Sequence, residues 1–298
     1  MKPGFLRTFA LLGALLAGGM LPQAHQALPL VRWLIIGMLF LVFLQTRFTR
    51  DSLQRSHAVL FLANLLMGGA GWLLGYAVGG RDLALAGFFA GITPTATAAP
   101  VIVHFLGGRT DYVVTAFVLG NVGISASFPV LLPAVLQTPT PDLFTHVLMT
   151  MAVLVFLPLA AALGLRALHP SASRWPGRLG VVSFSAWVLS LFIITANASH
   201  FLRTQSEVSA LVTLEIAAVS AVICAANFAL GRWIGGPVFR REASQSLGQK
   251  NTSLTIYVAT AYANPLVALG PTTYVLWHNL WNSWQLYRAR QAPHRPSP

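Results

Sequence analysis

Charged residues are scarce in this sequence. They make up 9% of its 298 residues, whereas about 25% is usual in a soluble globular domain. So few charges cannot cover a water-facing surface of this size, and the composition therefore excludes an ordinary soluble fold. It predicts instead that most of the surface faces an apolar environment.

Cysteine and acidic residues are scarcer still. Cys224 is the single cysteine, which rules out an internal disulfide. Of the seven acidic residues, only Glu215 falls well inside an apolar run. The sequence has no HExxH motif, no Cys/His cluster, no glycine-rich nucleotide loop and no paired aspartates within an apolar run. These absences disfavour an intramembrane enzyme or a sensor, and we predict no metal and no cofactor.

Long apolar runs are what the sequence has in abundance. Each is about 18–25 residues long, enough for an α-helix to cross a hydrocarbon core of about 30 Å. We therefore predict an all-α membrane protein with ten transmembrane helices and short connections. The predicted spans are 5–22, 28–46, 57–79, 82–106, 111–136, 143–168, 179–202, 207–232, 240–262 and 264–287.

Basic residues are distributed unevenly between the ends of these spans. If the N-terminus is cytoplasmic, fifteen of the 19 basic residues fall at cytoplasmic ends. Three, Arg32, Arg81 and Arg203, fall at outer ends, and Lys250 falls within a span. This is the positive-inside pattern, so the net charge of +12 indicates topology in a lipid bilayer rather than nucleic-acid binding. It predicts a plasma (inner) membrane protein with both termini in the cytoplasm.

The first span has a second interpretation. Residues 1–27 have a basic start, a short apolar stretch and a small-residue end, which is also typical of a cleaved signal peptide. Removing it would leave nine spans and disturb the charge alternation.

The polar connection "QTPTPD", residues 137–142, divides the ten spans into two sets of five. An odd number of spans per half makes the second half enter the membrane in the opposite direction, as in an inverted repeat. We predict a first repeat over 1–136, a second over 143–287 and a disordered cytoplasmic tail over 288–298.

Two spans at matching places in these halves contain helix-breaking or polar residues. The fourth contains "GITPTATAAPVIVHFLGG", with two prolines and the threonines Thr93, Thr95 and Thr97. The ninth contains "REASQSLGQKNTSLTIYV", including Lys250, Asn251 and Thr252. Interrupted helices at corresponding positions of two halves are typical of a transport site near the midplane. A proline kink that only aids packing is the alternative.

Three local motifs resemble the bile acid:sodium symporter family. They are the fourth-span break followed by "DYVVTAFVLGN", the ninth-span "SLGQKNTSL", and "VLWHNLWNS" in the tenth span. The resemblance implies a panel domain and a core domain, with broken helices four and nine crossing in the core. It also implies alternating-access transport of organic anions together with sodium.

The sequence departs from this family at the positions that would bind sodium. Ala99 and Pro100 replace residues with side-chain oxygens, and Ser246 replaces a glutamate. Lys250 replaces a glutamine, whereas Thr115 keeps a hydroxyl in the fifth span. Because a hard cation prefers oxygen ligands and negative charge, we expect weakened or absent sodium coupling. Titration of Lys250 would couple transport to protons instead.

Lys250 is the residue that most needs an explanation. A lysine at a helix centre costs about 2.5–3.5 kcal/mol on insertion scales, so it usually faces a cavity or a partner. It either supplies a fixed positive charge at the crossing or extends toward the cytoplasmic face. Glu215 is a possible charge partner, or else it lies in water near the outer end.

Polar residues of the tenth span complete the predicted site. His278 and Asn279 lie midway along that span and would contact the solute or join neighbouring helices. Asn121 and Asn197 are interpreted as helix–helix contacts. The favoured function is secondary transport of a small organic anion, such as a carboxylate metabolite. A passive facilitator or channel of the same fold is the alternative.

Overall fold

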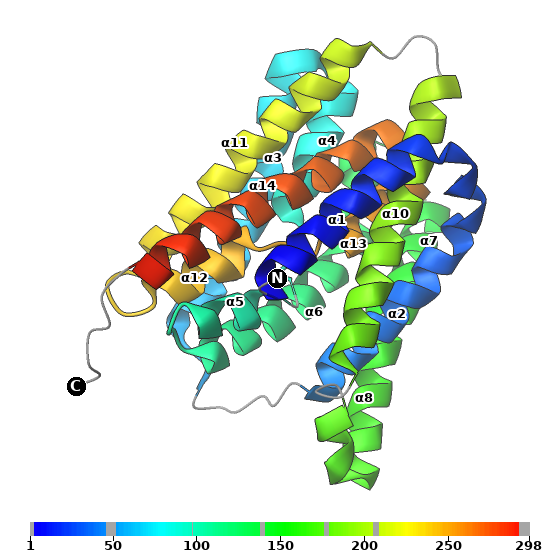
Figure 1. Cartoon of the computed structure of the whole chain (residues 1–298). Helices are drawn as coiled ribbons and strands as arrows, with labels where there is room; N and C mark the ends of the chain where they lie inside the picture. Colours follow the sequence, from blue (N-terminus) through cyan, green and yellow to red (C-terminus); the bar gives the residue numbers. More distant parts are fainter. Residues whose placement is uncertain are drawn as a thin grey trace.

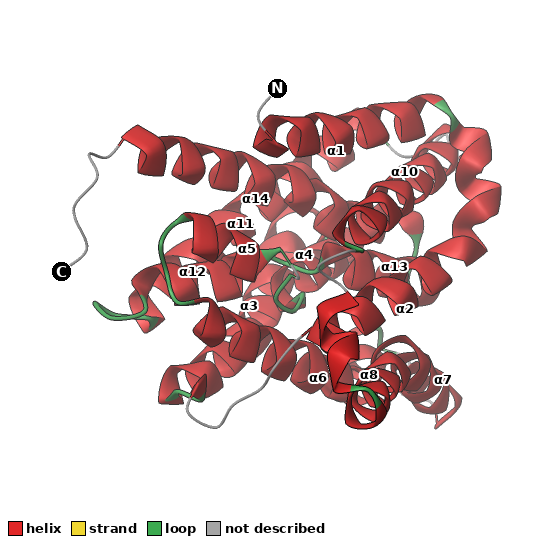
Figure 2. Ribbon diagram, turned by 60° about the horizontal axis from the view of Figure 1, so that its bottom comes forward, coloured by secondary structure: helices red, strands yellow, loops and turns green. Residues whose placement is uncertain are grey.

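The structure is a computed structural model that describes residues 3–45, 52–96, 98–137, 141–175, 179–204 and 209–291. Within these residues it is entirely helical apart from turns and one isolated β-bridge (Figures 1 and 2). In chain order the helical elements are α1 (Pro3–Met20), the 3₁₀ helix η1 (Pro22–Ala27), α2 (Leu28–Gln45), α3 (Arg55–Gly79), α4 (Arg81–Ile92), α5 (Ala99–Phe105), α6 (Thr110–Val135), α7 (Pro141–Met151), the π-helix η3 (Ala152–Phe156), α8 (Leu157–Leu168), the 3₁₀ helix η4 (Pro170–Arg174), α10 (Gly180–Thr204), α11 (Ala210–Ile234), α12 (Arg240–Gly248), α13 (Thr252–Tyr262) and α14 (Pro265–Gln291).

Six helical segments of the described chain are long and apolar enough to cross a bilayer, as expected of a multi-pass membrane protein. Apolar side chains also point outward, and on α3 Leu62, Leu66 and Leu73 are 57%, 72% and 65% exposed. An apolar outer face of this kind suits lipid rather than water. The six segments are Pro22–Leu44, Arg55–Gly79, Thr110–Val135, Pro141–Leu168, Val181–Phe201 and Ala210–Ile234. The count of ten spans and their inverted symmetry stay predictions.

One predicted boundary differs from the structure. Helix α14 continues to Gln291, so the predicted tail does not begin at residue 288. The Arg288 guanidinium lies 4.9 Å from the ring of Trp284, one turn earlier, and this contact supports the extra helical turn. Residues 292–298, and residues 138–140 of the predicted connection between the halves, lie outside the described residues.

The helix interruptions predicted in the fourth and ninth runs are present. Helix α4 ends at Ile92 and α5 starts at Ala99. Helix α12 ends at Gly248 and α13 starts at Thr252. Figure 2 shows α4 near the centre of the bundle, with longer helices around it. Residues Glu242–Gly248 of α12 and most of α13 are buried as well. Every residue from Leu83 to Ala96 is buried.

Close helix packing fixes the position of α4. A Cβ atom on Gly71 of α3 would collide with the carbonyl of Gly87, and one on Gly75 would collide with the carbonyl of Leu83. Helices α3 and α4 can approach this closely only because both positions lack a side chain. Helix α12 is held against α11 in the same way, since a Cβ atom on Gly231 would meet the carbonyl of Ala243.

A continuous apolar core joins the inner helices to α2, α6 and the α7–η3–α8 segment. It includes Phe43 of α2, Phe89 of α4 and Phe117 of α6, and it reaches Leu254 of α13. The two interrupted helices are therefore enclosed by apolar packing on this side. Any polar group at the interruptions needs a partner supplied by the protein.

Candidate functional site

The two helix interruptions meet and form hydrogen bonds with each other. Thr95 and Lys250 form an isolated antiparallel β-bridge. The Ala96 N–H donates to the carbonyl of Gln249 at 2.7 Å, and the Asn251 N–H donates to the carbonyl of Pro94 at 2.7 Å. Each interruption thus satisfies backbone groups that the other one releases, which a low-dielectric interior requires. We call this pair of segments, Thr93–Ala96 and Gln249–Asn251, the crossover.

Local sequence explains the first interruption well. Thr93 precedes Pro94 and has φ −48° and ψ 130°, an extended conformation that a following proline favours. Pro94 has no N–H to continue α4. Pro100 lies in the first turn of α5, where a proline is well tolerated. This segment therefore ends one helix and starts the next.

The second interruption has no proline and depends on packing. Gly248, the last residue of α12, lies against the ring of Phe228, where a Cβ atom would collide. Gln249 is extended, with φ −86° and ψ 102°. The glycine and the pairing with the first segment thus end α12.

The side chain of Lys250 is buried at the crossover, with 2% of its surface exposed. Its Nζ donates to Oδ1 of Asn64 on α3 and, at 3.0 Å, to the carbonyl of Gly91 on α4. The alternative of an extension toward the cytoplasmic face is therefore wrong. The reason is that the carboxyl end of α4, which carries partial negative charge, and the amide oxygen of Asn64 provide nearer partners.

Glu215 does not pair with Lys250. Its carboxylate lies beside Gly79, at the far end of α3. Asn64, the partner of Lys250, is fifteen residues earlier on that helix, which corresponds to roughly 22 Å at 1.5 Å per residue. Of the two alternatives for Glu215, the pairing with Lys250 is therefore wrong, because the two groups lie far apart along α3.

The threonines of the first interruption bond to the protein itself. Thr93 Oγ1 donates to the carbonyl of Phe89 at 2.5 Å and lies 2.8 Å from the hydroxyl of Thr255. Thr95 Oγ1 donates to the carbonyl of Ser246 at 2.6 Å. Thr97 lies outside the described residues. The hydroxyl groups of Thr93 and Thr95 therefore stabilise the crossover.

Asn121 of α6 lies at the centre of this network. Its Nδ2 donates to the carbonyls of Thr95 and Phe117, both at 2.9 Å. Its Oδ1 accepts from Nδ2 of Asn251 at 3.0 Å. The expected helix–helix role is thus too narrow, because Asn121 binds both segments of the crossover. Thr252, which follows Asn251, is buried and starts α13.

The positions predicted for sodium differ in their contacts. Ala99 is buried in an apolar cluster with Tyr112 and Leu247, and Pro100 begins α5 beside it. Thr115 Oγ1 is 3.0 Å from the carbonyl of Asp111 and 2.6 Å from the hydroxyl of Ser52. Lys250 is part of the crossover, the Ser246 carbonyl accepts from Thr95, and the Ala99 N–H donates to the carbonyl of Ala96 at 3.2 Å. Ser246 takes part through its carbonyl, while its hydroxyl donates to the carbonyl of Glu242 at 2.8 Å.

The polar residues of α14 differ from one another in their contacts. Asn279 donates to the carbonyl of Val275 in its own helix, at 2.7 Å, and therefore has a local partner. His278 is 1% exposed, and neither of its ring nitrogens has a hydrogen-bond partner. A buried imidazole without a partner is costly, so His278 is suited to a small polar molecule that binds between the helices.

Sequence reasoning missed several residues that support the crossover. Tyr274, one turn before His278, donates to the carbonyl of Gly248 at 2.9 Å and accepts from Asn227 at 3.2 Å. Asn282, one turn after His278, donates to the side chain of Gln249. Asn64 was missed as well. The available signal was the rarity of a side-chain amide within a long apolar run, as at Asn64 and Asn227.

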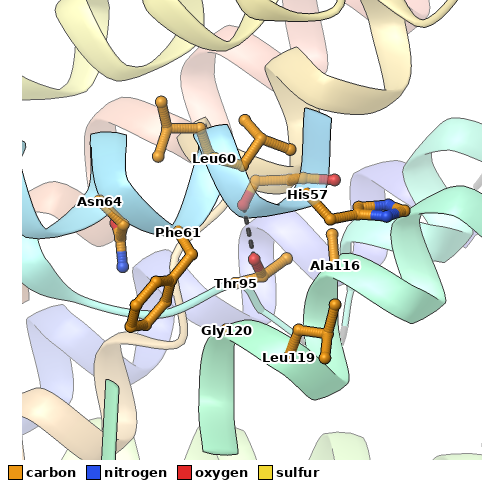
Figure 3. Close-up of a pocket in the computed structure, with 10 residues that line it drawn as sticks. His57, Leu60, Phe61, Asn64, Thr95, Ala116, Leu119 and Gly120 are labelled. Atoms are coloured by element: carbon orange, nitrogen blue, oxygen red, sulfur yellow. Dashed lines mark hydrogen bonds between the residues drawn. The ribbon is translucent and has the colours of Figure 1, made fainter. Parts of the chain in front are cut away.

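A small cavity lies beside the crossover, between α3, α6 and α12 (Figure 3). Its volume is about 20 Å³, which is room for about one water molecule. Asn64 and Thr95 line it, together with His57 and Ser246, and Leu60, Phe61 and Leu119 supply apolar walls. A solute larger than water would fit into this cavity only if the surrounding helices moved.

No protein-family model matches this chain, and none of the curated proteins matches it. The resemblance to bile acid:sodium symporters accordingly rests on the three local motifs and on the interrupted helices.

Proposed function

We propose that this protein is a secondary transporter that moves a small organic anion across the plasma membrane by alternating access. One observation carries the proposal: two interrupted helices, distant in sequence, pair with each other inside a bundle of apolar helices. Interrupted helices place polar backbone at membrane depth, which is useful where ions or solutes pass. A bundle with only a packing role could use continuous helices.

The proposed architecture has ten transmembrane segments in two inverted halves, 1–136 and 143–287. The interrupted pairs α4–α5 and α12–α13 are then the fourth segment of each half. The excess of basic residues at one side supports cytoplasmic termini. The motif resemblance to bile acid:sodium symporters supports the same arrangement and the same class of cargo.

Charge and polarity at the crossover favour an anionic solute. Lys250 lies in the middle of a predicted span, whereas the other lysine and arginine residues of the sequence lie at or near span ends. The amino end of α13 begins directly after it, and helix amino ends attract negative charge. Asn251 and His278 add groups that can donate hydrogen bonds to a carboxylate. A carboxylate metabolite fits this combination.

A passive facilitator with the same fold is the second candidate, and one observation favours it. The Lys250 ammonium stands where a coupled transporter would bind a mobile cation near interrupted backbone. A fixed charge of this kind cannot carry energy from an ion gradient. Concentrative uptake therefore distinguishes the two candidates.

The test is a screen for ligands followed by a transport assay. The purified protein is first screened for thermal stabilisation by small carboxylates, with and without sodium. A stabilising anion is then offered to proteoliposomes. Uptake above the external concentration under an ion or proton gradient supports secondary transport, whereas uptake that stops at equality supports the facilitator. If no carboxylate is transported, the proposed substrate class is wrong.

A further inference from the structure

The oxygens that hold the Lys250 ammonium have the character of an alkali-cation site. We propose that Asn64 Oδ1 and the Gly91 carbonyl form a site for a small monovalent cation, which the chain fills permanently with its own ammonium group. The consequence for coupling rests on the proposed transport function. The site itself can be tested by binding alone, without any knowledge of the solute.

The first support comes from the carboxyl end of α4. Thr93 and Pro94 turn the chain away, so the last carbonyls of α4 lose the N–H partners that a continuing helix would supply. Three of the last four carbonyls, those of Phe89, Gly91 and Ile92, accept a hydrogen bond from a side chain. Thr93 Oγ1 donates to the Phe89 carbonyl, Asn64 Nδ2 donates to the Ile92 carbonyl at 2.9 Å, and Lys250 donates to the Gly91 carbonyl. Lys250 is the only one of the three donors that can carry a positive charge.

The second support is the chemistry of the ligands. Within the described residues, the single ion pair is Arg109 with Asp111, and no carboxylate contacts Lys250. Its partners are a neutral amide oxygen and a carbonyl at the negative end of a helix dipole. Neutral oxygens of this type are also ligands for hard metal cations. The same two atoms therefore suit an ammonium group, an alkali cation or a small alkylammonium ion.

The third support is the direction from which the lysine arrives. Lys250 belongs to the second interruption, whereas Asn64 lies on α3 and Gly91 on α4. The Lys250 side chain thus links the α12–α13 segment to both α3 and α4. A tethered group has a high effective concentration at its site, so a free cation cannot displace it. The natural chain should therefore not be stabilised by a dissolved cation binding at this position.

Removing the ammonium should open the site to dissolved cations. In Lys250→Ala, we expect the melting temperature of the purified protein to fall relative to the natural chain. At constant ionic strength, ammonium, methylammonium or sodium chloride should raise it again in a saturable way, and choline chloride should not because choline is too large. The natural chain should respond equally to all four salts. Lys250→Ala combined with Asn64→Leu should lose the specific response.

An identical response of Lys250→Ala to choline and to the small cations would overturn the proposal, as would rescue that survives Asn64→Leu. If Lys250→Ala does not fold, two variants of the otherwise natural chain replace it. Asn64→Asp should raise the melting temperature, because a carboxylate binds the ammonium more tightly, and Asn64→Leu should lower it. Equal changes in melting temperature in these two variants would also contradict the proposed cation site. Since no solute is used, a failure to find transport leaves this result unaffected.

Discussion

Asn121 forms hydrogen bonds with both segments of the crossover, through Thr95 and Asn251. We predict that Asn121→Leu destabilises the protein, because the Thr95 carbonyl and the Asn251 amide lose a buried partner. An unsatisfied buried polar group costs about 1–3 kcal/mol. Thermal unfolding of the purified protein measures the loss.

Asn279→Leu provides a matched control in the same assay. Its amide bonds only to the Val275 carbonyl of its own helix, which already belongs to the helical hydrogen-bond pattern. This variant should therefore stay close to the natural stability. Equal losses of stability from the two substitutions would show that the hydrogen bonds of Asn121 at the crossover do not contribute more to stability than a local bond within one helix.

His278 provides a second prediction at the scale of one residue. Because neither ring nitrogen has a partner, His278→Phe removes no hydrogen bond within the protein. The ring is preserved and a buried polar group is lost, so stability should be unchanged or slightly higher. Binding of the anion found by thermal shift should weaken about tenfold or more.

The contrast between stability and binding is the check on His278. If the imidazole only joins helices, His278→Phe should lower the melting temperature and leave ligand affinity unchanged. Thermal-shift titration of the variant and of the natural chain measures both quantities in one experiment.

The importance of Lys250 could be predicted from the sequence, but its partners could not. A lysine in an apolar run is costly in any structure, so composition alone singles it out. Its partner depends on depth in the bundle, and the sequence does not place Asn64 and Glu215 at their respective depths. Glu215 was one of two open alternatives in the sequence, whereas in the structure a neutral amide and a helix end hold the ammonium.

At the scale of elements, the interruption of α4 was predictable and its packing was not. Pro94 and Pro100 act on the backbone locally, so they mark the break in any context. The break at Gly248 depends on contact with Phe228 on another helix. A glycine in a sequence does not identify such a contact. The second interruption was predicted instead from the polar residues around Gly248.

The contact between α3 and α4 yields a prediction about glycines. Gly71 faces the backbone of Gly87, while Gly69 faces open space. We predict that Gly71→Ala forces the two helices apart and lowers the melting temperature, because α4 carries the Gly91 carbonyl that binds Lys250. Gly69→Ala should leave the melting temperature unchanged or raise it, since alanine is favoured over glycine in helices by about 1 kcal/mol. Similar losses in both variants would contradict the close contact.

At the scale of the whole molecule, the helical fold was predictable because the apolar runs have the length of a bilayer. The run 111–136 corresponds to α6, Thr110–Val135, and 57–79 corresponds to α3, Arg55–Gly79. The side of the membrane on which each end lies is not determined by helix packing. Only the distribution of Lys and Arg bears on it.

Topology is therefore a separate prediction for the whole chain. Reporter fusions at Arg81 and Arg203 should be external, and fusions at Arg55 and Arg178 should be cytoplasmic. An alkaline phosphatase and fluorescent protein pair reports the two sides in cells. A nine-span pattern with an external N-terminus would contradict both the charge argument and the inverted halves.

Independence from sodium is the prediction that involves the whole transport cycle. The Lys250 ammonium lies at the crossover, so a sodium ion bound there would be repelled. At an effective dielectric constant of about 20, two unit charges 4 Å apart interact by roughly 4 kcal/mol. This corresponds to about three orders of magnitude in affinity, and no carboxylate among the contacts of Lys250 offsets it. Uptake of the transported anion into proteoliposomes should therefore persist when choline replaces sodium. Lys250→Ala should lose uptake in choline and regain part of it in methylammonium or sodium. A steep sodium requirement in the natural chain, with normal uptake by Lys250→Ala, would place the coupling site elsewhere.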